Sequence, residues 1–111
     1  MYWNDFKTQI KEILQRHEGR DRAITARGLS DITGQPDRRV RLVIRELIKE
    51  GMPILSSTES PAGYFLPSNW HELNECAASL RGRLIEDAKR RRDLLRAGAL
   101  YLKPAEQRKL L

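Results

Sequence analysis

The fold is decided by residues 25–54, which read TARGLSDITGQPDRRVRLVIRELIKEGMPI. Two apolar patterns of helical period lie in this stretch, over residues 26–33 and residues 37–50, and a turn that contains Gly34 separates them. Gly51 follows the second pattern and is a natural C-terminal cap. The stretch therefore predicts a short helix, a tight turn and a longer helix.

The short predicted helix has a clear start and a clear face. Thr25 precedes it and has the side chain of an N-cap. Leu29 and Ile32 are expected to form its buried face. Pro36 separates it from the longer helix and pre-sets the first turn of that helix.

The longer predicted helix sorts its side chains into three groups when successive residues are placed about 100° apart. One side is apolar and is expected to be buried: Val40, Val43, Ile44, Leu47 and Ile48. The opposite side is basic: Arg38, Arg41, Arg45 and Lys49, with Leu42 among them. One flank carries mixed charge: Arg39, Glu46 and Glu50.

Upstream of this pair, an apolar stripe over residues 3–17 predicts a first helix, with Asn4 or Asp5 as its cap and His17 at its boundary. A short extended segment over residues 23–25 connects it to the pair. We therefore expect three helices before residue 51.

Downstream of the pair, the period changes from helical to two. Residues 53–57 and residues 63–66 predict two strands of a β-hairpin. A last helix is expected to begin at Ser68 or Asn69, with Asn69 and Glu72 as a capping box. Its expected inner face is Leu73, Ala77, Leu80, Leu84, Ala88 and Leu95. We expect Gly98 to end this helix, and Pro104 to break a loosely held tail over residues 100–111.

The pattern predicts an α+β, mostly helical fold: three helices and a two-stranded wing over residues 1–67, followed by a long C-terminal helix and tail over residues 68–111.

The chain has 111 residues, 21 Lys and Arg against 15 Asp and Glu, and a net charge of +6. No run of 18 apolar residues offers a membrane span, and the first residues lack the pattern of a secretory signal. A single cysteine, Cys76, favours a reducing cytoplasm.

The two-helix stretch and the hairpin together resemble a known family. Residues 25–34 resemble the first half of the helix-turn-helix in bacterial and phage winged-helix proteins, and residues 37–54 resemble their recognition helix running into the first wing strand. The Gly-Tyr at residues 63–64 is similar to the start of their second wing strand. The N-terminal repressor domain of bifunctional biotin protein ligases shares this layout. The resemblance implies a cytoplasmic, bacterial or phage-encoded regulator that binds double-stranded DNA.

The basic side of the longer helix suits the major groove, since arginine forms forked contacts with guanine edges and phosphates. Arg38 is the best candidate for a guanine contact, and Arg41 and Arg45 suit either bases or phosphates. The alternative is a solvated face balanced by Glu46 and Glu50. The full set of candidate DNA-binding residues is Thr25, Gln35, Arg38, Arg39, Arg41, Arg45, Lys49 and Ser57.

Two positions leave alternatives open. Thr25 offers an amide or hydroxyl to a phosphate, although capping alone explains it equally well. Gln35 is either a solvent-facing turn residue or a polar contact to DNA. The predicted wing carries no Arg or Lys at its tip and includes Glu59, so recognition is expected to depend on the longer helix.

The last helix is longer than a small domain needs, and its leucines require cover. We expect a second copy of the chain to supply that cover; folding back along the first helix is the alternative. The basic run at residues 89–92 suits a DNA backbone or a solvated face, and two pairs spaced i,i+4 favour the solvated face: Arg83 with Asp87 and Lys89 with Asp93.

No motif indicates catalysis. His71 and Glu72 begin a zinc-protease-like pattern, but Glu75 stands where the second histidine is required. Cys76 reads as a small core residue, since no histidine pairing is signalled. We therefore expect no enzyme, no cofactor and no metal. The alternative to a DNA-binding regulator is a protein–protein interaction module that uses the winged helix and the long helix as a docking scaffold.

Overall fold

The structure is a computed structural model that describes the backbone of residues 2–110 and the side chains of residues 2–103. It is mostly helical, with four α-helices and one two-stranded antiparallel sheet in the described residues. The elements in chain order are α1 (Trp3–Leu14), a short 3₁₀ turn η1 (Arg20–Arg22), α2 (Ala26–Thr33), α3 (Asp37–Lys49), β1 (Leu55–Ser57), β2 (Gly63–Phe65) and α4 (Trp70–Leu110). The chain divides into two compact units, residues 1–76 and residues 77–111.

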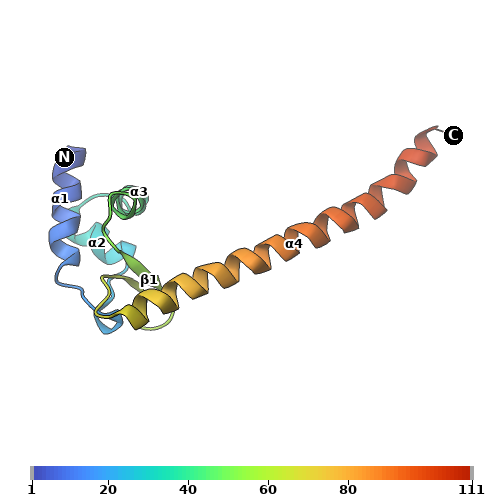
Figure 1. Cartoon of the computed structure of the whole chain (residues 1–111). Coiled ribbons are helices and arrows are strands. Elements are labelled where there is room, and N and C mark those ends of the chain that lie inside the picture. Colours follow the sequence, from blue (N-terminus) through green and yellow to red (C-terminus); the bar gives the residue numbers. More distant parts are fainter. Residues whose placement is uncertain (1, 111) are drawn as a thin grey trace. The chain divides into compact units, whose positions relative to one another are not determined.

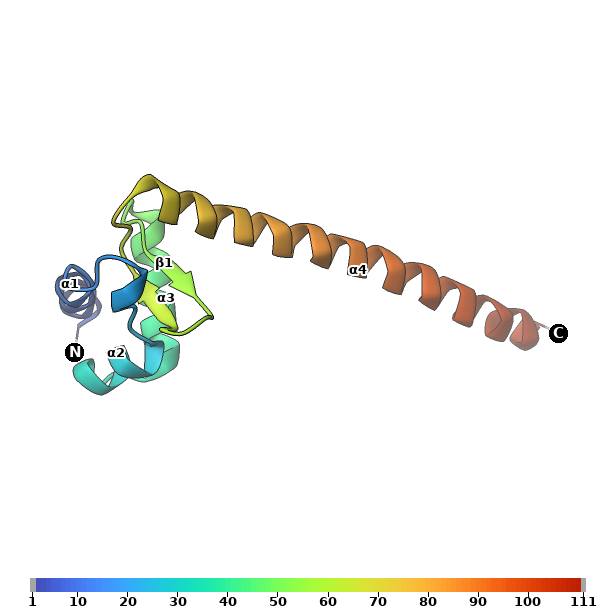
Figure 2. The same ribbon diagram turned by 90° about the horizontal axis from the view of Figure 1, so that it is seen from below.

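The core of the N-terminal unit lies between the first three helices, which pack against one another (Figures 1 and 2). Each helix contributes side chains with no measurable exposure: Phe6, Ile10 and Leu14 from α1, Leu29 from α2, and Val40, Val43 and Leu47 from α3. Ile54, Leu55 and Phe65 extend the buried set into the hairpin. The three-helix arrangement leaves the opposite side of α3 without cover.

Helix α2 and its turn confirm most of the sequence prediction. The Thr25 hydroxyl accepts a hydrogen bond from the Gly28 amide at 2.9 Å, and Gly34 ends the helix in the left-handed conformation at φ 74°. The prediction that Ile32 is buried is wrong, because its side chain is 56% exposed. The buried face is formed by Ala26, Leu29 and Thr33, and Ile32 lies roughly 90° from its centre at 100° per residue.

Helix α3 spans Asp37–Lys49, with Glu50 as its C-cap and Gly51 beyond it at φ 106°. The predicted apolar side is confirmed except at Ile48, which is 47% exposed. Ile48 lies roughly 90° around the helix from the centre of the buried stripe. The helical spacing grouped it with Val43, Ile44 and Leu47, but its side chain points in a different direction from theirs.

Helix α1 begins earlier and ends earlier than predicted. Its N-cap is Tyr2, which makes no side-chain capping bond, so the prediction of Asn4 or Asp5 as the cap is wrong. Both residues lie inside the first turn, where the charge of Asp5 suits the positive end of the helix dipole. The helix ends at Leu14 rather than at residue 17, since the His17 carbonyl turns away to accept the Leu66 amide at 2.9 Å.

The hairpin pairs β1 with β2 in antiparallel register, with Leu55 opposite Phe65 and Ser57 opposite Gly63. On the other edge of β2, Ile24 and Tyr64 exchange both backbone hydrogen bonds, at 2.7 and 2.9 Å. This exchange brings the predicted extended segment of residues 23–25 beside the hairpin. Gly63 permits the approach, because a Cβ there would lie 2.3 Å from the Ile24 carbonyl.

The start of α4 is held by its predicted capping residues. The Asn69 side chain accepts the Glu72 amide at 2.9 Å, and the Glu72 carboxylate accepts the backbone amides of Ser68 at 2.8 Å and Arg20 at 2.9 Å. These two amides, together with the Ser68 hydroxyl, lower the pKa of Glu72 below its usual range. Glu72 therefore ties the first turn of α4 to η1 within the N-terminal unit.

Helix α4 continues past both predicted stops, to Leu110. Gly98 does not end it, because one glycine costs a helix only about 1 kcal/mol relative to alanine. Pro104 does not end it either: the helix runs on to Leu110, although an interior proline removes one backbone donor and crowds the carbonyl of the preceding turn. The expected inner face is not buried beyond Leu73: the side chains of Leu80, Leu84 and Leu95 are all more than half exposed.

None of the helices in residues 2–110 combines the length and the apolar character needed to cross a membrane.

Candidate nucleic-acid interface

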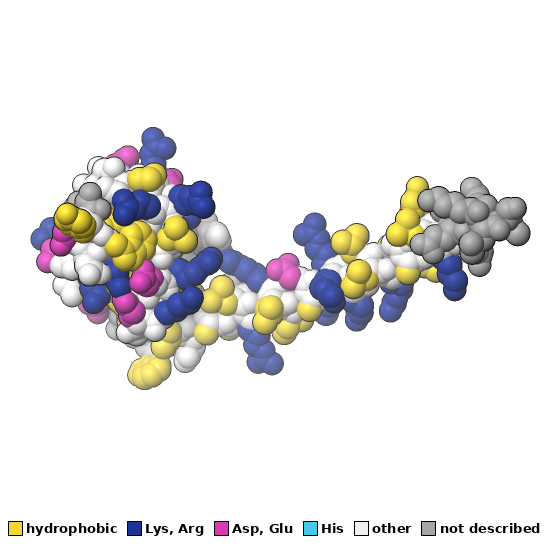
Figure 3. All heavy atoms as spheres, turned by 90° about the horizontal axis from the view of Figure 1, so that it is seen from above, with side chains coloured by type: hydrophobic (Ala, Val, Ile, Leu, Met, Phe, Trp, Pro, Cys, Tyr) yellow, Lys and Arg dark blue, Asp and Glu magenta, His cyan; other side chains and the backbone are white. Residues whose placement is uncertain are grey.

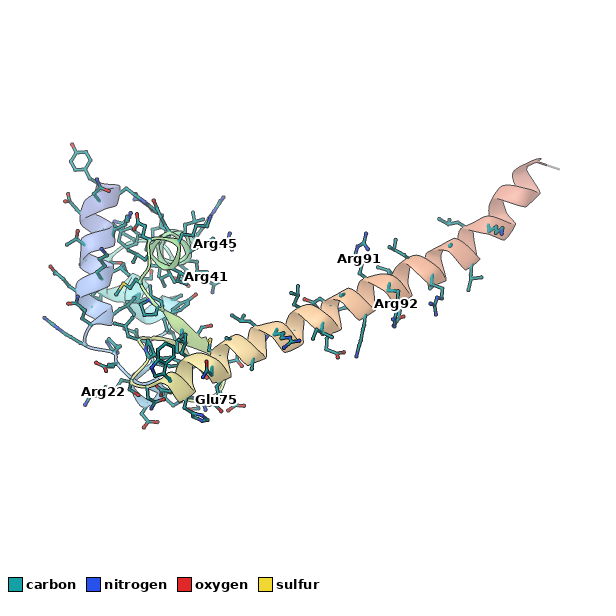
Figure 4. All side chains as sticks on the ribbon, viewed as in Figure 1. Arg22, Arg41, Arg45, Glu75, Arg91 and Arg92 are labelled. Atoms are coloured by element: carbon teal, nitrogen blue, oxygen red, sulfur yellow. The ribbon has the colours of Figure 1, made fainter. Side chains whose placement is uncertain are left out.

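The candidate interface is the side of α3 that lies opposite the core. This outer face consists of Arg38, Arg41, Leu42, Arg45 and Lys49, all of which are exposed. Its four cations form no ion pair and no hydrogen bond with any side chain in residues 2–103. Figure 4 shows Arg41 and Arg45 on the side of α3 that faces away from α1.

The outer face is hollowed rather than flat. A shallow depression of about 410 Å³ is lined by Arg38, Arg41, Leu42 and Arg45, with Asp37 at the start of the helix. Figure 3 shows a group of Lys and Arg side chains on the face of the N-terminal unit that is in view. An anionic ligand at this depression would meet unpaired guanidinium groups from successive turns of one helix.

The mixed-charge flank of α3, formed by Arg39, Glu46 and Glu50, has a different environment. The Arg39 guanidinium lies over two aromatic rings of α1, 5.4 Å from the Trp3 ring centre and 5.7 Å from that of Phe6. Its Nη1 also donates to the Gln35 side-chain oxygen at 2.7 Å. Arg39 is thus half-buried and bonded within the fold, and the structure does not bring it together with the outer cations.

The two acids of this flank also bond to α1. The Trp3 indole N–H donates to Glu46, and Lys7 pairs with Glu50 and lies 3.6 Å from Glu46. The hydrogen bond with Glu50 and the charge of Glu46 raise the pKa of Lys7 above its usual value, against the effect of desolvation. Glu46 and Glu50 therefore pair with Lys7 rather than with the arginines of the outer face, and Glu46 also accepts the Trp3 hydrogen bond.

The turn before α3 uses most of the polar atoms of Gln35. Its backbone carbonyl accepts the Ser30 hydroxyl at 2.6 Å, its amide donates to the Thr33 hydroxyl at 3.3 Å, and its side chain accepts from Arg39. Thr25 is exposed, but its hydroxyl is used in capping α2. Both residues position α2 and α3, and only their remaining polar atoms are free to meet a ligand.

A cation from outside the hairpin pairs with the hairpin tip, and the sequence did not indicate it. Ser57 exchanges hydrogen bonds with the backbone of Glu59, at 3.2 and 3.3 Å. The Glu59 carboxylate pairs with the Arg20 guanidinium at 2.6 Å. Arg20 comes from η1, and 39 positions separate it from Glu59, so no local pattern could have signalled the pair. The pair cancels the negative charge that Glu59 would otherwise give to the hairpin tip.

The basic run of α4 is exposed and only partly paired. Lys89 lies 3.4 Å from Glu86, and Arg92 lies 3.3 Å from its neighbour Asp93. The predicted pair of Lys89 with Asp93 is not formed, because Lys89 lies near Glu86 and Asp93 near Arg92 instead. The predicted pair of Arg83 with Asp87 is also not formed among the described side chains. Arg91 and Arg92 lie on different sides of the helix (Figure 4).

The residues that resemble a zinc-protease motif hold no metal-binding geometry. His71 lies 3.6 Å from Glu75 as a pair spaced i,i+4, and Cys76 is half-buried with its Sγ 3.9 Å from the Ser56 carbonyl rather than in the core. Among the residues that the structure describes, no group of three His, Cys, Asp or Glu could hold a metal ion.

Comparison with known proteins adds no family: no family profile, no curated protein and no solved structure matches the chain.

Proposed function

We propose that this protein is a winged helix-turn-helix protein that binds double-stranded DNA in a sequence-specific manner, as a small transcriptional or phage-type regulator. In this proposal α3 enters the major groove, and the cations of the outer face contact bases and phosphates. The protein acts as a homodimer in the cytoplasm of a bacterial cell.

The order of the elements supports the winged-helix proposal. Helices α2 and α3 are joined by the three residues 34–36, and the β1–β2 hairpin follows α3 directly. Ile24 adds a third short extended segment to β2. A helix pair followed by a small sheet of this kind places the second helix where its outer side is free to enter a groove.

The observation that carries the DNA-binding proposal is the difference in pairing between the two charged sides of α3. Arg39, Glu46 and Glu50 all have partners within the fold, whereas the four outer cations have none among the described side chains. Unpaired arginines on one helix face supply both steering and contact for a polyanion. In this proposal Arg38, at the start of α3, contacts a guanine edge, since the N-terminal residues of a recognition helix are those that contact base edges.

The test begins by selecting bound sequences from a random DNA pool with the full chain. The affinity of the selected duplex is then measured for Arg38→Ala/Arg41→Ala and for the wild type. We expect the double variant to lose about 100-fold in affinity, at roughly 1–2 kcal/mol for each arginine contact. The control is Lys11→Ala/Arg16→Ala, which removes two exposed charges from the region of α1 and should change affinity only slightly.

A result in which both double variants bind equally well would overturn the assignment of the outer face. A chain that shows no salt-sensitive binding to any duplex would favour the second candidate function, a protein-docking module. The observation behind that candidate is the exposed apolar side chains along α4.

A further inference from the structure

Helix α4 carries a regular stripe that the proposed function does not explain. Within the C-terminal unit, leucine and alanine recur at intervals of three or four residues, and a single arginine interrupts them: Ala77, Leu80, Leu84, Ala88, Arg91, Leu95, Ala99 and Leu102. All eight side chains are exposed, and the four leucines have exposed fractions between 55% and 70%. Figure 3 shows hydrophobic and basic side chains following one another along this helix.

The stripe has an 11-residue period. Ala77, Ala88 and Ala99 are 11 residues apart, as are Leu84 and Leu95. Eleven residues make three turns at 3.67 residues per turn, which is close to the 3.6 of an α-helix, so the stripe stays on one side. At 100° per residue the eight positions fall within about 100° of the circumference, which is the width of a helix–helix contact.

The spacing of the stripe, though not its residue types, is the same from either end. Reversing it about the midpoint between residues 89 and 90 exchanges Leu84 with Leu95, Leu80 with Ala99, Ala77 with Leu102, and Ala88 with Arg91. Three of these four exchanges match a large side chain with a small one. A two-fold axis through that midpoint would therefore pack the stripe of one copy against the stripe of a second copy, large against small.

Charge favours the same direction. In an antiparallel pair, Arg91 of one copy faces Ala88 of the second copy and lies beside Asp87 of that copy, and the contact occurs twice. In a parallel pair, Arg91 would face Arg91 of the second copy, each leucine would face a leucine, and each alanine would face an alanine. Like charges that face each other across a helix seam oppose pairing, so the parallel arrangement is disfavoured.

We infer that α4 pairs with α4 of a second copy as an antiparallel two-helix coiled coil, centred between residues 89 and 90. This inference rests on the homodimer proposed above but not on DNA binding. It sets the two Cys76 residues, where the N-terminal units end, about 40 Å apart along the paired helices at 1.5 Å per residue.

The arrangement is tested by pulsed EPR on the full chain in the absence of DNA. Cys76→Ser removes the native thiol, and a spin label is placed at either Lys89→Cys or Lys103→Cys, both exposed positions outside the stripe. The antiparallel pair predicts a short label–label distance, below about 30 Å, at residue 89 and a distance of about 40 Å or more at residue 103. A parallel pair would give short distances at both sites and would overturn the inference.

A second measurement uses the charge pair. Arg91→Asp places an acid beside Asp87 of the second copy and should weaken dimerisation about tenfold, while Asp87→Arg/Arg91→Asp restores the pair and the affinity. Sedimentation equilibrium measures the dimerisation affinity of both variants. Equal affinities for the wild type and both variants, or a chain that stays monomeric at every concentration, would contradict the antiparallel pair. Neither result would bear on DNA binding by the outer face of α3.

Discussion

Arg38 and Arg39 are neighbours in the chain, but their side chains lie in different environments in the fold. Arg39 lies over Trp3 and Phe6 and donates to Gln35, whereas Arg38 is exposed and lines the depression on the outer face. About 100° of helix rotation separates the two side chains. The difference shows that a cation count says little about function until each charge is assigned either to a partner in the fold or to solvent.

The same distinction holds for the whole of α3. The flank toward α1 uses its charges to hold two helices together, and the outer face leaves its charges available. A substitution on the flank should therefore change stability and leave DNA affinity intact in the folded protein, while one on the outer face should do the reverse.

The largest effect on stability is expected at Trp3, which anchors the flank. Trp3→Ala removes the edge contact with Phe6 at 5.8 Å between ring centres, the contact with Arg39 and the hydrogen bond to Glu46. We expect the free energy of unfolding to fall by about 3 kcal/mol, as for other large aromatic truncations. Urea denaturation measures it, with Tyr2→Ala as the control, because Tyr2 is 83% exposed. Equal losses for both variants would contradict the role given to Trp3.

The neighbouring arginines give the sharpest contrast. Arg39→Ala should lower the free energy of unfolding by about 1.5 kcal/mol, through loss of the aromatic contact and one hydrogen bond, and leave DNA affinity within about twofold. Arg38→Ala should leave stability unchanged and weaken DNA binding about tenfold. Thermal unfolding and fluorescence anisotropy on the same two variants measure the contrast. If the two variants behave alike in both assays, the division of α3 into two functional sides is wrong.

Glu72 gives a pH test in a region away from α3. Hydrogen bonds from Ser68 and Arg20 lower its pKa, so its stabilisation is present above the usual pKa of about 4.5 and is lost as the pH falls through the lower, folded value. Glu72→Gln should cost about 1 kcal/mol at neutral pH and almost nothing at the acid end of the transition. Melting temperatures of the wild type and the variant across that range measure the difference. A constant difference at every pH would show that the carboxylate charge is not involved.

Lys7 is expected to have the smallest effect on stability, and its pH dependence is opposite to that of Glu72. Its pKa is raised by Glu50 and Glu46, so its stabilisation is present below the usual pKa of 10.5 and is lost as the pH rises through the higher, folded value. Lys7→Met should show a slightly lower melting temperature than the wild type at neutral pH, and the two should converge in strong alkali. DNA affinity at neutral pH should be nearly unchanged, because Lys7 is paired on the flank rather than on the outer face.

Periodicity in the sequence predicted the elements whose burial repeats within one helix. Val40, Val43 and Leu47 are buried as predicted, because they share one stripe. Ile32 and Ile48 were assigned to the core from the same count, and they lie at the edges of their stripes, where the neighbouring helices do not reach. The prediction is limited by geometry. The spacing of apolar residues shows which side of a helix faces the core, but it does not show how wide the contact with the neighbouring helices is.

Contacts between distant segments could not be predicted in the same way. The partners of Arg39 lie on α1, and the partner of Glu59 is Arg20, and no local spacing encodes either contact. The expected stop at Gly98 had a further consequence, since it cut the 11-residue pattern of α4 before Ala99 and Leu102. The symmetric spacing of the stripe becomes visible only when the helix continues.

The most direct test of the outer face is the salt dependence of DNA binding. Affinity for the selected duplex is measured from about 50 to about 300 mM salt, for the wild type and for Arg41→Ala/Arg45→Ala. Each phosphate contact contributes about 0.9 to the slope of log affinity against log salt, so we predict that the variant loses about 2 from the wild-type slope. Lys11→Ala/Arg16→Ala should keep the wild-type slope. Identical slopes for all three proteins would contradict the claim that the unpaired cations of α3 contact DNA.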